Sequence, residues 1–108
     1  MRIIETGIPG LIEIEPEVFH DSRGYLCEIY NERRYREAGI LDEFCQENFS
    51  KSRYGVIRGL HYQLPPFSQA KLATCQGGVI LVVAVDLRKD SPTFGQWRGC
   101  HLTGDNQV

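Results

Sequence analysis

The chain is divided into many short segments of β-branched or alternating residues, which Gly, Pro, Asp and Ser separate. The most apolar of them is VILVVAV at residues 79–85. Short strands separated by turn residues are typical of antiparallel sandwiches and barrels. We therefore expect an all-β fold in a single domain, residues 1–108. The expected strands are residues 2–5, 11–15, 24–30, 45–49, 56–63, 71–76, 79–86 and 96–103.

One helix is expected to interrupt the strands, at residues 32–38 (ERRYREA). Asn31 can cap its first turn, and Gly39 suits the left-handed position after the last turn. Because the helix is short and highly charged, we expect it on the surface.

Charge and hydropathy exclude several classes of function. The formal net charge is -2, whereas a globally basic nucleic-acid binder needs an excess of Lys and Arg. The run at 79–85 is far shorter than the roughly 20 residues of a membrane-spanning helix. The first ten residues contain Glu5 and turn residues before any long apolar segment, so they do not resemble a secretory signal. We expect a cytoplasmic protein with neither a nucleic-acid nor a membrane partner.

The four cysteines are spread along the chain with no C-x-x-C pair, which argues against a zinc ribbon or a thioredoxin-like centre. We expect reduced thiols that are buried or half-buried. The alternative is a secreted protein with two disulfides. The cysteines are Cys27, Cys45, Cys75 and Cys100.

Strand alternation gathers polar side chains on one face of several expected strands. His61 and Gln63 lie two residues apart, as do Gln46 and Asn48, and Lys71 begins another strand. If these faces point inward, the barrel interior is a binding cavity, as in a cupin-like jelly roll. Cupin metal sites commonly place a second His where this chain has Gln63, and the ammonium of Lys71 would repel a divalent cation. We therefore expect no metal site.

His61 and Lys71 suit proton chemistry better than metal binding. Histidine changes charge near neutral pH, and a lysine can stabilise an enolate oxygen, so the pair could remove a proton beside a carbonyl. Arg23 and Arg58 could clamp a diphosphate with paired hydrogen bonds. The alternative is that His61 is a hydrogen-bonded structural residue and that Lys71 and both arginines are solvated surface charges.

Several motifs in order resemble one family, that of the dTDP-4-dehydrorhamnose 3,5-epimerases. They are FHDSRGYLCE at 19–28, QENFSKS at 46–52, RGLHYQ at 58–63, QAK at 69–71, VDLR at 85–88 and SPTFG at 91–95. The resemblance implies a cupin-type jelly roll without metal or cofactor that acts on dTDP-4-dehydro-6-deoxy-glucose in dTDP-L-rhamnose biosynthesis. It also implies a homodimer in which amino-terminal strands such as 2–5 pair across subunits.

The resemblance assigns a role to each matching position. His61 corresponds to the base that removes the C3 and C5 protons, which the C4 ketone acidifies, and Lys71 to the residue that stabilises the enolate. The substrate-contacting positions are Arg23, Glu28, Gln46, Asn48 and Arg58, the arginines serving the diphosphate. The general-acid Tyr and the Asp that orients the base lie, in the family, on strands after the region of Val108. The chain thus resembles an amino-terminal portion of an epimerase.

Strict alternation would place Arg58 and His61 on opposite faces, although both should reach one substrate. Gly59 between them could allow a bulge that redirects the next side chains, so we predict an irregularity in the strand ladder at residues 58–60. Two alternatives to the epimerase stay open. One is a monofunctional epimerase or keto-isomerase on the same scaffold, and the other is a non-catalytic cupin-like binding module.

Overall fold

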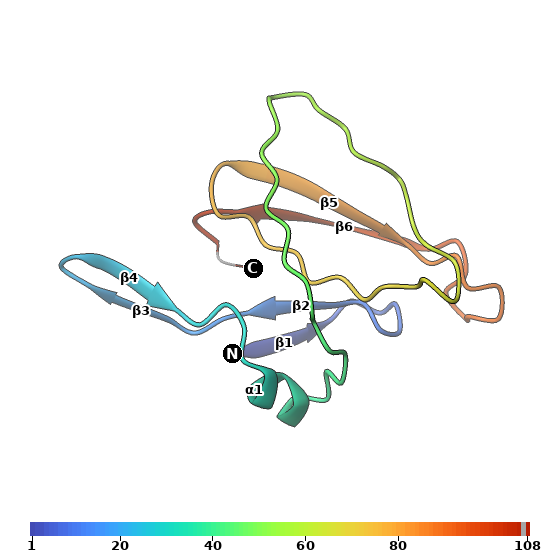
Figure 1. Ribbon diagram of the computed structural model, residues 1–108, viewed down its shortest axis with the longest axis horizontal. Helices are drawn as coiled ribbons and strands as arrows, with labels where there is room; N and C mark the ends of the chain where they lie inside the picture. The colour runs from blue at the N-terminus through green and yellow to red at the C-terminus, as the bar shows by residue number, and fades with distance from the viewer. Residues whose placement is uncertain (107) are drawn as a thin grey trace.

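The computed structural model describes residues 1–106 and 108, and its regular structure is three antiparallel hairpins and one helix (Figure 1). Each hairpin is a separate two-stranded sheet. The elements are β1 (Arg2–Glu5), β2 (Ile12–Glu15), β3 (Val18–Asp21), β4 (Gly24–Cys27), α1 (Glu32–Glu37), β5 (Val79–Val85) and β6 (Trp97–Thr103).

Local sequence explains the first two hairpins. β2 (IEIE) alternates in polarity, β1 (RIIE) places two isoleucines between charged ends, and their register pairs Ile3 with Ile14. The Thr6 hydroxyl closes the connection between them by donating to the carbonyl oxygen of Leu11 at 2.7 Å. At the tip of β3–β4, the backbone N–H of Arg23 donates to the Asp21 carboxylate at 2.8 Å, so the short polar turn is stabilised by its own side chain.

The helix forms where the sequence predicts it. The Asn31 side chain accepts a hydrogen bond from the backbone N–H of Arg34 at 3.2 Å, as an N-cap residue should. Gly39 follows the last turn with a φ of 86°, in the left-handed region. Tyr35 is the buried residue of the helix, and its hydroxyl donates to the carbonyl oxygen of Ile29 at 2.8 Å.

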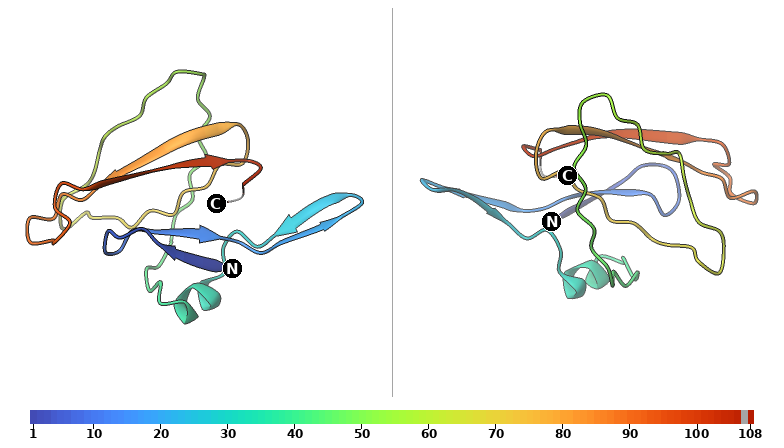
Figure 2. Two further views of the ribbon diagram at one scale, coloured as in Figure 1. Left: turned by 180° about the vertical axis from the view of Figure 1, so that it is seen from behind. Right: turned by 45° about the horizontal axis from the view of Figure 1, so that its top comes forward.

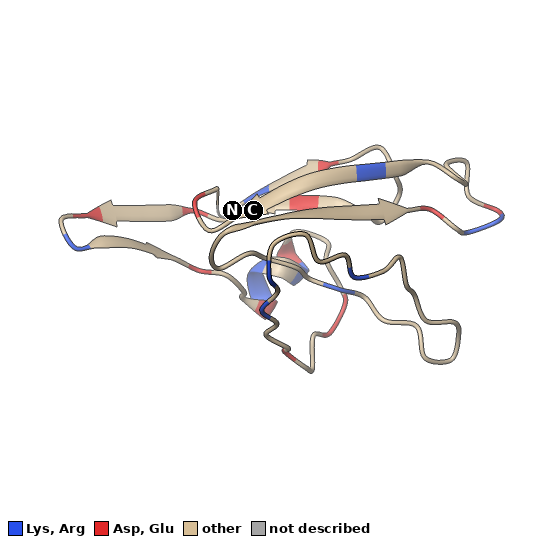
Figure 3. Cartoon of the chain, turned by 90° about the horizontal axis from the view of Figure 1, so that it is seen from above, with Lys and Arg blue, Asp and Glu red and all other residues tan. Residues whose placement is uncertain are grey.

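The β5–β6 hairpin lies over β1–β2, with the chain ends near the middle of the molecule (Figures 1 and 2). Two long-range contacts join the hairpins. The Arg98 guanidinium on β6 lies 3.2 Å from the Glu13 carboxylate on β2, and Nη2 of Arg88 donates to the carbonyl oxygen of Pro9 at 2.7 Å. The other charged residues gather on α1 or are scattered over strands and loops (Figure 3).

Three expected strands are wrong. Residues 45–49, 56–63 and 71–76 form no strand; they belong to a long irregular excursion that loops beside β5–β6 (Figure 1). A strand persists only when a neighbour accepts its ladder hydrogen bonds, and among the described residues no segment pairs with these three. One strand was missed, β3, whose sequence VFHD is too short and polar to show alternation.

The molecule is unusually open for its mass. Its accessible surface is 9187 Å², whereas a compact protein of this mass exposes about 6,100 Å². The radius of gyration is 15.2 Å, against about 13 Å for a compact chain of this length. Its buried apolar residues are few: Ile8, Tyr35, Cys75 and Leu102.

Candidate functional site

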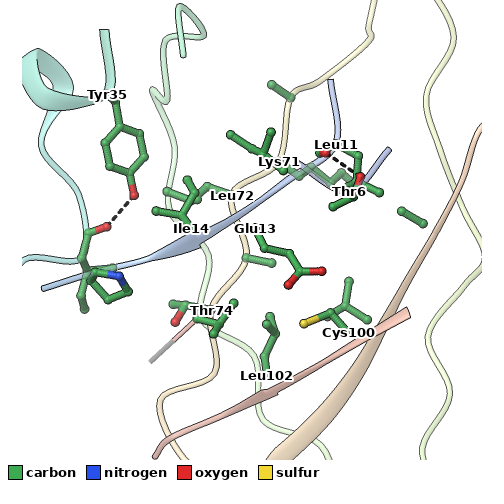
Figure 4. A pocket seen from close by; sticks show the side chains of 18 of the residues that line it. Thr6, Leu11, Glu13, Ile14, Tyr35, Lys71, Leu72, Thr74, Cys100 and Leu102 are labelled. Carbon is green, nitrogen blue, oxygen red and sulfur yellow. Dashed lines mark hydrogen bonds between the residues drawn. The ribbon is translucent and has the colours of Figure 1, made fainter. Parts of the chain in front are cut away.

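A cavity of about 300 Å³ lies between the β1–β2 and β5–β6 hairpins, and the segment that carries Lys71 forms another wall (Figure 4). Most of its lining is apolar, with Ile14, Leu72 and Leu102 visible around it. Of the seven predicted site residues, Lys71 and Glu28 line this cavity. Its size and its mixture of apolar walls with a few charged groups are those of a small-molecule site.

Glu28 is held by its own neighbourhood. Its carboxylate accepts hydrogen bonds from the Asn31 side chain and from Arg34, each at 2.9 Å. These contacts hold the pKa of Glu28 below its ordinary value, and the hydrogen bond from Asn31 has the larger effect. A substrate hydroxyl that uses this carboxylate would therefore meet an ionised acceptor, oriented from the start of α1.

The sequence reasoning missed one charged pair in this cavity. Glu13 points into it from β2, and its carboxylate pairs with Arg98 (Figure 4). The thiol of Cys100 faces the same space, and burial, followed by the nearby Glu13 carboxylate, raises its pKa. A signal was present in the pattern IEIE of β2, because Glu13 faces the same side as Ile4 across the hairpin.

His61 lies on irregular backbone rather than on a strand. In the described part of the chain, no hydrogen bond or ion pair holds its imidazole, and it lines neither of the two cavities. Gly59 lies close to the ring, because a Cβ at position 59 would be 2.9 Å from Nδ1 of His61. Gly59 has a φ of 114° and is joined to Leu60 by a cis peptide bond. Residues 58–60 form no ladder in which the predicted irregularity could be tested, because the strand expected around them is absent.

The other predicted substrate-contacting residues are exposed and make local contacts. Nε2 of Gln46 donates to Oδ1 of Asn48 at 3.1 Å. Nε of Arg58 donates to the Ser52 hydroxyl at 3.0 Å. At the tip of β3–β4, Arg23 forms an ion pair with Asp21 at 2.6 Å, which raises the pKa of Arg23. The structure thus places Gln46 beside Asn48, and Lys71 and Glu28 on one cavity, but it does not bring all seven residues together.

Metal ligands and disulfides can be stated for the described residues. Residues 1–106 and 108 contain no group of three or more His, Cys, Asp or Glu side chains that could hold a metal ion. The four cysteines are free thiols. Cys75 is buried and Cys27 and Cys100 are half-buried, as predicted, but Cys45 is exposed. No helix in this part of the chain is long and apolar enough to cross a membrane.

Antiparallel hairpins stacked around a partly polar cavity define an all-β protein of the cupin-like jelly-roll class. Sequence comparison gives the family. The sequence model described as dTDP-4-dehydrorhamnose 3,5-epimerase matches residues 5–108, and the chain belongs to that family.

Individual relatives agree with this family membership. The chain is 50% identical to a dTDP-4-dehydrorhamnose 3,5-epimerase of Shigella flexneri over an alignment of 108 positions, which covers 99% of this chain and 60% of the relative. The crystal structure of the enzyme of that name from Elizabethkingia anophelis superposes with a TM-score of 0.92 at 46% identity and covers 99% of this chain. This chain covers 59% of that structure.

A further solved relative carries a bound sugar nucleotide. It is a dTDP-6-deoxy-D-glucose-3,5-epimerase from Legionella pneumophila in complex with dTDP-4-keto-L-rhamnose. It has a TM-score of 0.91 and 49% identity, over 97% of this chain and 56% of its own. The chain therefore spans about 60% of the length of the relatives it matches.

Proposed function

We propose that this chain is part of an enzyme that epimerises dTDP-4-dehydro-6-deoxy-D-glucose at C3 and C5, giving dTDP-4-dehydro-L-rhamnose. The observation that carries the proposal is family membership over residues 5–108, with solved relatives at TM-scores of 0.91 and 0.92. The Legionella relative with dTDP-4-keto-L-rhamnose bound supports the class of substrate.

In the proposed reaction, His61 takes the proton from the carbon next to the C4 ketone, and the electron pair of the broken C–H bond passes to the ketone oxygen. Lys71 stabilises the resulting enolate. Return of a proton to the opposite face of the carbon inverts it, and this step needs an acid for which the chain offers no matching residue. Arg23, Glu28, Gln46, Asn48 and Arg58 bind the nucleotide sugar, with the arginines on its diphosphate.

Gln46, Asn48 and Arg58 are exposed in this chain, and we propose that further strands of the full-length protein cover them and complete the site. Gln46, Asn48 and Arg58 are paired with other residues of the chain, so a substrate would exchange these contacts for its own. Lys71 already lines a cavity that could accept part of a small ligand. No cofactor or metal enters the proposed reaction.

The test is incubation of the full-length protein that contains these residues with the keto-sugar nucleotide in heavy water. Deuterium at both C3 and C5 is expected. Exchange at C3 alone, or movement of the ketone, would assign a monofunctional epimerase or a keto-isomerase instead. The control is a His61→Asn variant, which should lose the exchange; near-normal exchange in this variant would remove His61 as the base.

The observation that favours a second function, a non-catalytic binding module, is that His61 and Lys71 do not line one cavity. Calorimetry with dTDP and with a dTDP-sugar separates the two proposals. A module should bind the nucleotide without exchanging deuterium, whereas an enzyme should do both. Absence of both binding and exchange in the full-length protein would contradict both functions.

A homodimer is also part of the proposal. The surface of 9187 Å² exceeds that of a compact protein of this mass by more than the roughly 1,600 Å² that a standard interface buries. β1 pairs only with β2 in the described sheets, so its other edge can accept a strand from a second subunit. Sedimentation of the full-length protein should give twice the monomer mass, and a monomer at micromolar concentration would contradict this.

We also propose a cytoplasmic location, supported by the four free thiols. Fractionation of cells that produce the protein should recover it with cytoplasmic markers. Recovery from a secreted fraction with oxidised cysteines would contradict the proposal.

A further inference from the structure

One ion pair lies in a cavity whose walls are otherwise mostly apolar. Glu13 on β2 points into the cavity of about 300 Å³, and its carboxylate pairs with the guanidinium of Arg98 on β6 (Figure 4). The side chain of Glu13 is 20% exposed and that of Arg98 is 51% exposed, so the acid is the more enclosed member. Both residues lie within paired strands, which hold a side chain more precisely than a loop does.

Arg98 occupies only one oxygen of the Glu13 carboxylate. Its Nε donates to Oε1 at 3.2 Å, and its Nη2 lies 3.2 Å from the same oxygen. Among the described residues, no hydrogen bond or ion pair reaches Oε2. Fully buried side-chain oxygens in this part of the chain all have partners, so Oε2 is open to solvent, and Figure 4 shows the carboxylate directed into the cavity. The pair therefore presents to the cavity an oriented oxygen with free lone pairs.

Stability alone gives little reason for a charged pair at this place. Taking two charges out of water costs about as much as their attraction returns, so apolar residues of similar size often stabilise a protein equally well or better. In ligand cavities, by contrast, a few polar groups among apolar walls fix the orientation of the ligand. A carboxylate oxygen without a partner in that setting is suited to accept a hydrogen bond from a ligand hydroxyl.

The proposed substrate has hydroxyl groups of this kind. Its sugar has a ketone at C4, a methyl group at C6 and a ring oxygen on C5, so its free hydroxyls are those at C2 and C3. Lys71, which we propose to stabilise the enolate at the C4 oxygen, lines the same cavity. A sugar whose C4 oxygen reaches Lys71 thus presents its two hydroxyls to the other walls of that cavity.

We propose that Glu13 is a further substrate-binding residue, whose Oε2 accepts a hydrogen bond from the C2 or C3 hydroxyl of the sugar. Arg98 orients the carboxylate through Oε1. This inference rests on the proposed function, because it takes the keto-sugar nucleotide as the ligand. Glu13 then helps to determine which sugar is accepted, since a site that hydrogen-bonds a substrate hydroxyl disfavours an analogue without it.

The test is calorimetry of the full-length protein with dTDP and with dTDP-glucose, which has the sugar hydroxyls but no ketone and does not react. Glu13→Gln should weaken the binding of dTDP-glucose roughly 10- to 100-fold, as expected for a lost hydrogen bond to a charged group, and should leave dTDP binding within about twofold. An equal loss for both ligands, or no loss for either, overturns the proposal.

Glu15→Gln is the matched control. Glu15 lies on the same strand and is also paired with an arginine, Arg2 at 2.8 Å, but it does not line the cavity. This substitution should change neither affinity. If Glu13→Gln does not fold, the double variant Glu13→Gln with Arg98→Gln leaves no unpaired charge and is read by the same criteria.

Two deoxy analogues, dTDP-2-deoxyglucose and dTDP-3-deoxyglucose, identify the hydroxyl. Loss of the hydroxyl that Glu13 binds should weaken binding to the wild type about as much as Glu13→Gln does. The substitution should then have no further effect on that analogue, because the same hydrogen bond is already absent. If Glu13→Gln weakens the binding of both analogues as much as that of dTDP-glucose, Glu13 binds neither hydroxyl and the proposal is overturned.

Deuterium exchange separates this inference from the proposed function. If the wild type binds dTDP-glucose but exchanges no deuterium into the keto-sugar, the proposed function fails, whereas calorimetry still decides the role of Glu13. If the wild type exchanges deuterium and Glu13→Gln equals it in affinity and in kcat/KM, only the role of Glu13 is overturned. A wild type that binds no dTDP-sugar overturns both.

Discussion

Gly59→Ala should displace the His61 ring, because the ring occupies the space that a side chain at position 59 would need. A Cβ there would lie 2.9 Å from Nδ1 and 3.3 Å from the backbone nitrogen of His61. Ordinary Cβ contacts begin at 3.4 Å, so the ring has to move by about half an ångström. The main chain at position 59 cannot relieve the contact by moving toward residue 61, because the Cβ is already 3.3 Å from the backbone nitrogen of His61.

Gly55 provides a matched control in the same segment. Its φ is 79°, also in the left-handed region, but a Cβ there would meet nothing within 4 Å. Both alanine variants should therefore be destabilised by about 1–3 kcal/mol, because alanine is strained at a positive φ. Only Gly59→Ala should add the displacement of the imidazole.

The assay has two readouts. The NMR signal of the His61 ring should shift in Gly59→Ala and stay at its wild-type position in Gly55→Ala. In the full-length protein, deuterium exchange should fall roughly 10- to 100-fold further in Gly59→Ala than in Gly55→Ala, as expected for a misplaced base. Equal effects of the two substitutions on both readouts would refute the reasoning, because backbone strain alone would then account for them.

Three further predictions concern stability. Leu102→Ala should lower the free energy of unfolding by about 2–5 kcal/mol, because Leu102 is only 6% exposed. Leu26→Ala should lower it by less than about 0.5 kcal/mol, because Leu26 is 73% exposed. Urea denaturation measures both changes, and equal losses would contradict the described core. Asn31→Ala removes the acceptor for the Arg34 N–H and should lose about 1 kcal/mol, measured by thermal unfolding, with Asn31→Ser, which keeps a capping oxygen without adding a charge beside Glu28, expected to restore most of it. The pKa of Asp86 is held below its ordinary value of 3.8 by hydrogen bonds, mainly from Arg88 and then from Ser91 and Thr93. The ionised carboxylate therefore stabilises the folded chain above pH 3.8, and this contribution is lost as the pH falls below that value. Asp86→Asn should flatten the fall in stability below about pH 4, and an unchanged slope would contradict the assignment.

The elements that the sequence predicted correctly are those whose interactions are local. β1 is found at the predicted residues, and β5 and β6 differ from the prediction by one residue at one end. The helix ends one residue early, and its cap at Asn31 is confirmed. Turn residues and capping side chains act over a few positions, so the sequence alone contains the information that places them.

The three strands that failed depend on partners far away in the chain. Residues 56–63 have a strand-like pattern, yet Ile57 is 90% exposed and Leu60 75% exposed. Whether a strand forms depends on a neighbouring ladder, which no local pattern encodes.

The candidate site likewise has features that the local sequence predicts and features that depend on long-range pairing. The sequence singled out His61 and Lys71 by residue type, but their mutual geometry depends on long-range pairing. The hydrogen bonds from Ser91 and Thr93 to Asp86 lie within the motifs VDLR and SPTFG, and an Asp at a strand end followed by Ser and Thr is a local signal for a turn closed by side chains. The Glu13–Arg98 pair joins residues 85 positions apart, so the IEIE pattern of β2 could draw attention to Glu13 but could not identify Arg98 as its partner.

The openness of the molecule and the separation of its site residues have one physical cause. The segment around residues 45–74 carries large apolar side chains that are mostly exposed, among them Phe49 at 75% and Phe67 at 72%. Burial of such side chains stabilises a protein by roughly 25 cal/mol per Å², so added strands or a second subunit would be drawn to this segment. Pairing would also fix the register of residues 56–63, and with it the direction of His61 relative to Lys71. The apolar surface that the fold leaves uncovered is thus the same surface whose burial would assemble the proposed base and its enolate-stabilising lysine.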